Sequence, residues 1–169
     1  PLSDEQIQSI LRTEHGGINE SFADLYIITE DEKYLNTAKK LTHKNFLEPL
    51  LNKEDKLTGM HANTQIPKIL GFEKVATLTD DEKLLNAVKY FWNNVSQTRS
   101  VAFGGNSVGE HFNPIDDFSN MVKSNEGPET CNSYNMMRLS KALFINNNDP
   151  SYLDFYERTL YNHILSSQH

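Results

Sequence analysis

The chain has 169 residues, 37% of them hydrophobic, with a formal net charge of −7 and a single cysteine. This length suits one domain with a sizeable core, and the acidic balance argues against nucleic acid as a general partner, because phosphate binding needs clustered basic side chains. No apolar run reaches the roughly 18 residues that span a bilayer, and one cysteine excludes both an internal disulfide and a zinc site of four cysteines drawn from this chain alone.

Apolar residues recur at intervals of three and four along most of the chain, which predicts helices. In chain order, the predicted helices cover residues 4–13, 16–29, 31–43, 61–78, 81–97, 129–146 and 150–166. No segment alternates apolar and polar residues over the length of a strand. The sequence therefore predicts an all-α protein built from helical hairpins.

An internal repeat supports this hairpin organisation. The segment Thr29–Leu41 recurs as Thr79–Phe91, and a looser copy covers Asn148–Arg158. Near the start of each copy an Asp precedes a predicted helix, where a short acidic side chain caps free N–H groups and suits the helix dipole. We expect these residues to begin the second helix of each hairpin: Asp31, Asp81 and Asp149.

Two segments between the predicted helices are interpreted as loops. Residues 44–60 contain the pairs Glu48-Pro49 and Thr58-Gly59, and residues 98–128 contain several glycines and prolines. Loops as long as the second are usually functional or disordered. Its aromatic residues favour an ordered, packed loop: Phe103, Phe112 and Phe118.

A side chain able to bind a proton or a metal lies at the predicted start of each hairpin's first helix. Counting back from each capping Asp leads to His15, to His61 and, in the third copy, to Glu129 with Cys131. We expect these helix starts to gather at one end of the hairpin array. Chance alone is the competing explanation for one such residue per helix.

His15 and His61 are candidate ligand-binding residues. The helix dipole disfavours a cation at a helix N-terminus, so His15 is expected to be neutral and to form hydrogen bonds, with a simple helix cap as the alternative. His61 begins a run of polar side chains longer than one cap needs, which favours ligand contact. The other histidines are interpreted as surface or core residues: His43, His163 and His169. The role of His111 is left open, because it follows Glu110 directly.

Glu129 and Cys131 are candidate metal ligands. A thiol near a helix N-terminus has a lowered pKa, and a spacing of two lets both side chains reach one ion from the first helical turn. A lone cysteine is also commonly a small buried apolar residue, and two ligands do not fill a tetrahedral zinc shell.

Glu110 is a candidate proton donor in the long loop. Desolvation by Phe112 and Phe103 would raise the pKa of its carboxyl group, whereas an exposed position would make it an ordinary surface acid. Together with Glu129 it also suggests a glycosidase that uses two carboxylates.

Five motifs, taken together, resemble one family. They are Glu14–Glu20, Leu57–Lys68, Gly104–Phe112, Glu129–Met136 and Tyr161–Leu165, and they occur in family order from about Leu11 to His169. The chain is similar to the β-L-arabinofuranosidase family, glycoside hydrolase family 127, and its close relatives. The resemblance implies that residues 1–169 are part of an (α/α)6 toroid that forms the catalytic domain.

The resemblance also implies a chemistry. In that family, terminal L-arabinofuranosyl groups are released with retention from plant-type glycans or glycoproteins, through a zinc-bound cysteine nucleophile and a glutamate acid/base. Carried over to matching positions, Glu110 would be the acid/base, Glu129 and Cys131 would be zinc ligands, and His15 and His61 would bind the sugar. The substrate would be a carbohydrate, and zinc would be the cofactor.

The chain also departs from the family pattern. In the family, the nucleophile is one of two adjacent cysteines, which we expect beyond His169. The remaining toroid helices and the β-sandwich domains are expected there as well. We therefore expect this piece by itself to be inactive, and to self-associate through uncovered apolar faces. Pro1 is not an initiator methionine and no basic and apolar leader follows it, so a truncated or processed start is expected, and bacterial cytoplasm and periplasm are both compatible.

Two other functions are compatible with the hairpins. A helical-repeat module could present a concave surface to a protein partner, which would explain the repetition but not the polar helix starts. A toroid enzyme could instead act on sugars with two carboxylates and without a metal. Zinc content of the full-length protein, together with the variants Cys131→Ala and Glu110→Gln, distinguishes these possibilities.

Overall fold

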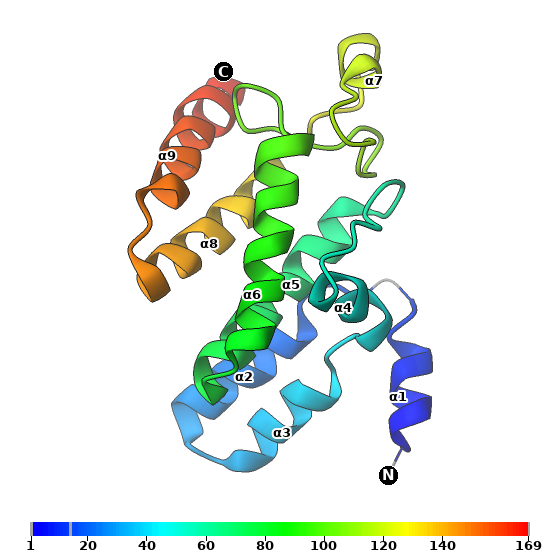
Figure 1. Cartoon of the computed structure of the whole chain (residues 1–169), viewed down its shortest axis with the longest axis vertical. Coiled ribbons are helices and arrows are strands. Elements are labelled where there is room, and N and C mark those ends of the chain that lie inside the picture. Colours follow the sequence, from blue (N-terminus) through cyan, green and yellow to red (C-terminus); the bar gives the residue numbers. More distant parts are fainter. Residues whose placement is uncertain (1, 14, 169) are drawn as a thin grey trace.

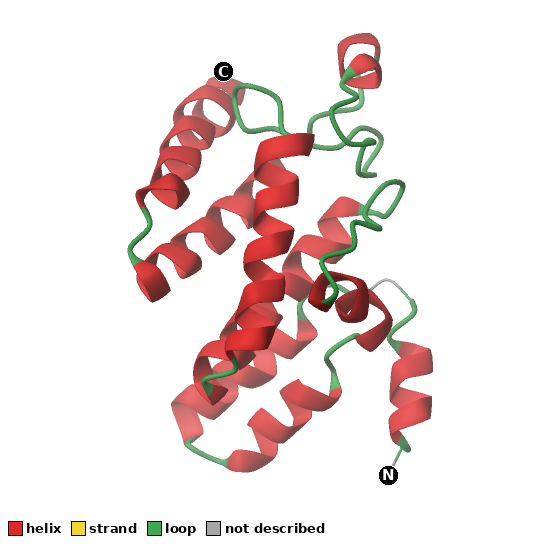
Figure 2. Ribbon diagram, in the orientation of Figure 1, coloured by secondary structure: helices red, strands yellow, loops and turns green. Residues whose placement is uncertain are grey.

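The described residues, 2–13 and 15–168, form helices joined by loops in the computed structural model, and only isolated β-bridges occur among them (Figure 2). The α-helices are α1 (Asp4–Ile10), α2 (Ile18–Thr29), α3 (Glu32–Lys40), α4 (Lys44–Leu51), α5 (Ala62–Thr79), α6 (Glu82–Asn93), α7 (Ser119–Lys123), α8 (Thr130–Asn147) and α9 (Pro150–Thr159). Two π-helices, η1 (Asn94–Arg99) and η2 (Leu160–Ile164), continue α6 and α9, and a 3₁₀ turn, η3 (Leu165–Ser167), follows. The all-α prediction is confirmed.

Three hairpins form the body of the molecule: α2–α3, α5–α6 and α8–α9 (Figure 1). The first helices of the hairpins, α2, α5 and α8, pack side by side with α5 in the middle. In each pair of neighbouring inner helices, residues later in one helix contact residues later in the other. Between α2 and α5 the polar contacts are Asn19 with Lys68 and Asp24 with Lys74, and between α5 and α8 they are Asn63 with Asn135 and Glu73 with Asn146. The three inner helices therefore run parallel, and their starts lie at the same end, as expected of hairpins in an (α/α)6 toroid.

The hairpin turns are built in one way. Each inner helix ends at a residue in the left-handed conformation whose N–H bonds the carbonyl four residues earlier, and an Asp caps the outer helix immediately afterwards. The pairs are Glu30-Asp31, Asp80-Asp81 and Asn148-Asp149. The predicted Asp caps are confirmed, and Pro150 occupies the first turn of α9 as its fixed φ favours.

The core lies around α5 and α6. Phe72, Phe91 and Trp92 are almost completely buried, and the indole N–H of Trp92 donates to Ser140 Oγ on α8 at 2.7 Å. The central position of α5 explains why it is buried along most of its length. Among the described residues, no helix is both long enough and apolar enough to cross a membrane.

The first predicted loop contains a helix that the sequence interpretation missed. Residues 44–60 include α4, although Pro49 lies inside it. Phe46 and Leu50 on this helix are buried, and the Phe46 ring lies 6.2 Å from that of Phe91. Burial of these apolar side chains outweighs the single hydrogen bond lost at Pro49.

The middle of the second predicted loop is packed, as expected, whereas Phe103 and residues 114–117 are exposed. Residues 100–128 contain only the short helix α7 and three isolated bridges. Phe112 is buried and its ring lies 6.1 Å from that of Phe91, so the middle of the loop is anchored in the core.

Candidate active site at the start of the inner helices

A short antiparallel pairing brings Glu110 to the start of α5. The N–H of Ala62 donates to the Glu110 carbonyl at 2.8 Å, and the N–H of Phe112 donates to the Met60 carbonyl at 2.9 Å. These bonds align the loop with the segment that precedes α5, and they explain why the side chains of His61 and Glu110 meet although they lie far apart in the sequence.

His61 has two different neighbours on its two ring nitrogens. As the N-cap of α5, its Nδ1 accepts the backbone N–H of Thr64 at 3.2 Å. An Nδ1 that accepts leaves the proton on Nε2 in the neutral ring, and Nε2 lies 3.4 Å from Oε2 of Glu110. The ring thus caps the helix and also faces a carboxylate, so the cap and ligand interpretations of His61 are compatible.

A pocket of about 420 Å³ opens beside His61. It is bordered by the turn after α1, by α4, α5 and the long loop, with polar side chains that include His43, Gln65, Lys68 and His111. Two buried polar atoms on its lining residues, Nε2 of His43 and Oε1 of Gln65, have no hydrogen-bond partner among the described residues. Such atoms suit a ligand rich in hydroxyl groups, because a buried polar atom without a partner is costly.

His15 lies beside this pocket. Its ring centroid is 5.9 Å from that of His43, which lines the pocket. The pKa of His15 is lowered, first by burial and then by the positive charge of Lys68, which favours the expected neutral ring. The helix-cap alternative is wrong, because the N-cap of α2 is Gly17.

His43 was not predicted as a site residue. Burial, followed by the charge of Lys68, lowers its pKa to about 4. The Lys68 ammonium lies 3.3 Å from its Nδ1. His43 is the N-cap of α4, so the signal was hidden when that helix was interpreted as a loop.

Glu129 and Cys131 lie together at the start of α8, as their spacing predicted. Sγ of Cys131 is 3.4 Å from Oε2 of Glu129, and the Glu129 side chain makes no helix-capping bond. The predicted lowering of the Cys131 pKa is wrong: burial raises it, and the adjacent Glu129 carboxylate raises it further. Desolvation and a like charge outweigh the helix dipole here.

The expected desolvation of Glu110 is also wrong. Its side chain is 58% exposed, and the two aromatic residues named for that role pack elsewhere: Phe112 against Phe91, and Phe103 against His163. The local feature that distinguishes Glu110 is its contact with His61.

Backbone and side-chain hydrogen bonds connect the segment that carries Glu110 and His61 to the segment that carries Glu129 and Cys131. The N–H of Gly109 donates to the Glu126 carbonyl at 2.8 Å, which joins the residue before Glu110 to the segment before Glu129. The side chains of Asn63 and Asn135 are hydrogen-bonded at 3.0 Å and join α5 to α8.

Among the residues that the structure describes, no group of three or more His, Cys, Asp or Glu side chains could hold a metal ion.

The chain is similar to known proteins of one family. A family model described as β-L-arabinofuranosidase, GH127 catalytic domain, matches residues 1–169. A solved GH127 β-arabinofuranosidase is 25% identical with a TM-score of 0.75, covering 88% of this chain and 25% of that chain. No curated protein matches the chain.

Two further solved structures support the fold. A GH127 β-L-arabinofuranosidase from Geobacillus stearothermophilus T6 is 22% identical with a TM-score of 0.77, covering 91% of this chain and 29% of that one. A structure titled glycoside hydrolase is 17% identical with a TM-score of 0.71, covering 96% and 32%. The chain therefore spans about a quarter to a third of the length of these structures.

Proposed function

The chain belongs to the GH127 β-L-arabinofuranosidase catalytic-domain family, and from this premise we propose that the protein containing it is a glycoside hydrolase that releases L-arabinofuranose with retention. The observation that carries the proposal is the contact between Glu110 and His61 beside a polar pocket at the start of α5. The substrates would be arabinofuranosides of plant-type glycans or glycoproteins.

In this proposal Glu110 is the general acid and then the base. Its carboxyl group would give a proton to the departing glycosidic oxygen and later take one from the attacking water. His61, with its proton on Nε2, orients the carboxylate from 3.4 Å and can also donate to a sugar hydroxyl. The exposed position of Glu110 leaves it open to a bound substrate.

The sugar itself would occupy the pocket beside His61. His15 and His61 would be its hydrogen-bonding residues, and the buried polar atoms of His43 and Gln65 offer further partners for hydroxyl groups. The lowered pKa of His15 favours a neutral imidazole, which both donates and accepts a hydrogen bond.

Glu129 and Cys131 would hold a zinc ion. The donor types fit, since carboxylate oxygen and thiolate sulfur are both zinc ligands, and the two side chains already face one another at 3.4 Å. They would supply two of the four ligands of a tetrahedral site. When bound, zinc supplies positive charge that keeps a ligating thiol deprotonated. We assign the nucleophile to none of the described residues.

The acid/base role is tested by Glu110→Gln in the protein that contains this chain. With methyl β-L-arabinofuranoside, whose leaving group needs a proton, we expect kcat/KM to fall by about 10²–10⁴. With 4-nitrophenyl β-L-arabinofuranoside the loss should be much smaller, because that leaving group departs without protonation. Glu157→Gln, an exposed carboxylate on α9, is the matched control and should leave both substrates unaffected. Equal losses on the two substrates would contradict the role.

Zinc content separates this proposal from the alternatives. Cys131→Ala should remove zinc as well as turnover, whereas Glu110→Gln should lose turnover and keep its zinc, as measured by metal analysis after gel filtration. A two-carboxylate enzyme without metal predicts that Cys131→Ala retains activity. A protein-binding module predicts that neither variant changes any hydrolysis.

A further inference from the structure

The outer helices of the second and third hairpins end in the same unusual way. Each continues into a π-helix, η1 after α6 and η2 after α9, and each π-helix carries a buried basic side chain. Arg99 is 1% exposed and His163 is 8% exposed. π-helical turns are rare and commonly occur near functional sites. Both side chains turn back to the segment that precedes the inner helix of their own hairpin.

Arg99 makes hydrogen bonds with the segments that flank the start of α5. Its guanidinium donates to Asp55 at 2.6 Å and to Thr58 at 3.3 Å, and it also bonds the carbonyl of Asn113. These groups lie shortly before His61 and shortly after Glu110. One side chain therefore ties together the two segments that bring His61 and Glu110 into contact.

His163 occupies the equivalent place at the start of α8. Its Nε2 lies 3.2 Å from the Pro128 carbonyl, and its Nδ1 lies 2.7 Å from Oγ of Ser133. Because a carbonyl only accepts, the proton is on Nε2, and Nδ1 accepts the Ser133 hydroxyl. The Phe103 ring packs edge-on against the imidazole at 5.1 Å.

These two bonds lie on either side of Glu129 and Cys131. Pro128 immediately precedes the pair and Ser133 follows it within the first turns of α8. Ser133 is completely buried. His163 thus fixes both ends of the short segment whose geometry decides whether the carboxylate and the thiol face one another.

We propose that His163 is a positioning residue that holds Glu129 and Cys131 in the geometry needed to bind a divalent cation. The identity of the cation rests on the proposed function, whereas the fixing of the pair does not. Removing a hydrogen bond made directly to a metal ligand typically changes metal affinity by about 10–100-fold. His163 acts one step further out, on the residues that flank the two ligands.

Helix α8 offers a matched pair of test variants. Ser133 and Ser140 are both completely buried, and each bonds a ring nitrogen on a neighbouring element at 2.7 Å, His163 in one case and Trp92 in the other. Ser133→Ala and Ser140→Ala therefore cause similar local damage at different distances from the Glu129–Cys131 pair. Thermal unfolding checks that both variants fold and lose comparable stability.

Two measurements are made on the protein that contains this chain. Zinc affinity is measured by competition with a chromogenic chelator, and the alkylation rate of Cys131 in the metal-free protein is measured with iodoacetamide and quantification of its peptide by mass spectrometry. We expect Ser133→Ala to bind zinc about 10-fold more weakly, the lower end of the range for bonds made directly to ligands. Its Cys131 should be alkylated several-fold faster, because a loosened first turn of α8 exposes the partly buried thiol more often. Ser140→Ala should match the wild type in both.

Substitution of His163 itself provides a rescue. His163→Phe removes both bonds, whereas the amide of His163→Gln can still donate to Pro128, so Gln should retain part of the zinc affinity that Phe loses. Equal zinc affinities and equal alkylation rates for Ser133→Ala and Ser140→Ala would overturn the proposal. If the wild type binds no zinc but the alkylation rates still differ, the zinc-ligand role fails and the positioning role of His163 stands.

Discussion

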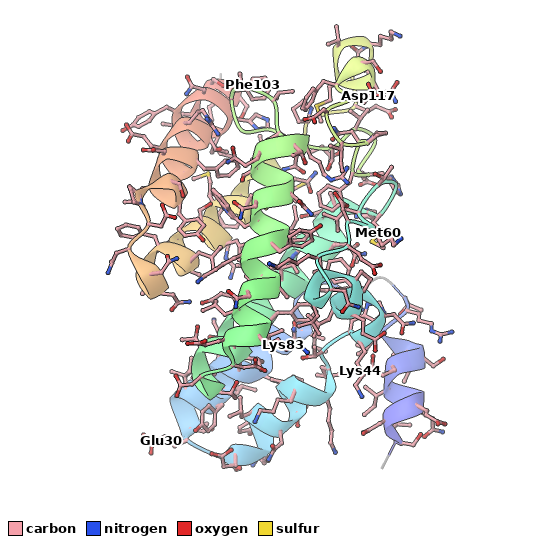
Figure 3. The ribbon with its side chains drawn as sticks, viewed as in Figure 1. Glu30, Lys44, Met60, Lys83, Phe103 and Asp117 are labelled. Atoms are coloured by element: carbon pink, nitrogen blue, oxygen red, sulfur yellow. The ribbon has the colours of Figure 1, made fainter. Side chains whose placement is uncertain are left out.

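The two ends of the hairpins differ in how uniform their capping residues are. At the turn end, all three inner helices finish with a left-handed residue and an Asp cap, so the same local structure occurs three times. At the other end, the N-caps of α2, α5 and α8 are Gly17, His61 and Glu129, and each makes different contacts. In Figure 3, Glu30 lies at the lower end of the molecule, whereas Met60 and Phe103 lie well away from it.

This difference separates folding from function. Repeated turn residues satisfy the backbone in the same way each time, which is sufficient for a hairpin. Helix capping alone does not explain Glu129, because its side chain makes no cap bond and instead lies against Cys131. The variable end is therefore where ligand chemistry is expected.

The largest expected effect on activity comes from replacing one N-cap residue at each end of the second hairpin. His61 and Asp81 both accept the N–H of the third residue that follows, Thr64 or Leu84. Replacing either by Ala should cost about 1 kcal/mol of unfolding free energy. Only His61→Ala should also reduce kcat/KM on an arabinofuranoside, by about 100-fold or more. Urea denaturation and initial rates measure the two effects; a large activity loss in Asp81→Ala would break the distinction.

The next effect is an acid lability located at the variable end. The folded-state pKa of His43 is about 4, below its ordinary value of 6.5, so between these pH values the unfolded chain binds more protons. Stability should therefore fall as the pH is lowered from about 6.5 to about 4. At the turn end, hydrogen bonds to Lys33 lower the pKa of Asp31, so this cap loses its contribution only as the pH falls below about 3.8.

Denaturation at pH 7 and pH 5 measures this lability, with His43→Gln as the test variant. The variant should show a smaller loss of stability between the two pH values than the wild type. Some loss should remain, because burial also lowers the pKa of His15 and of His163. An unchanged difference in His43→Gln would mean that other groups cause the acid sensitivity.

The smallest expected effects are gains at the turn end. Glu30 and Asp80 adopt φ values of 57° and 51°, which are unfavourable for side chains with a Cβ. Glu30→Gly and Asp80→Gly should each raise the unfolding free energy by about 0.5–1 kcal/mol, because the relieved strain exceeds the extra backbone entropy that Gly loses. Asn148→Gly should gain less, because Asn tolerates the left-handed region better. The urea midpoint at constant m-value measures these changes; a loss in the Glu30 variant would show that its side chain stabilises the turn.

Local sequence determined the elements of this protein. Apolar spacing located most of the helices, and Asp31, Asp81 and Asp149 marked the outer helix starts correctly, because capping depends on residues close in the sequence. The spacing of Glu129 and Cys131 likewise predicted that their side chains lie together. They meet because Glu129 is the extended N-cap of α8 and Cys131 lies in the first turn that follows.

Only the tertiary structure decided how these elements meet and which groups are buried. The contact of Glu110 with His61 depends on a backbone pairing between distant segments, and the bonds of His163 to Pro128 and Ser133 depend on how α9 packs against α8. The pKa of Cys131 rises rather than falls because burial there outweighs the helix dipole. Periodicity and caps report local backbone preferences, whereas burial and long-range pairing arise only when the hairpins pack.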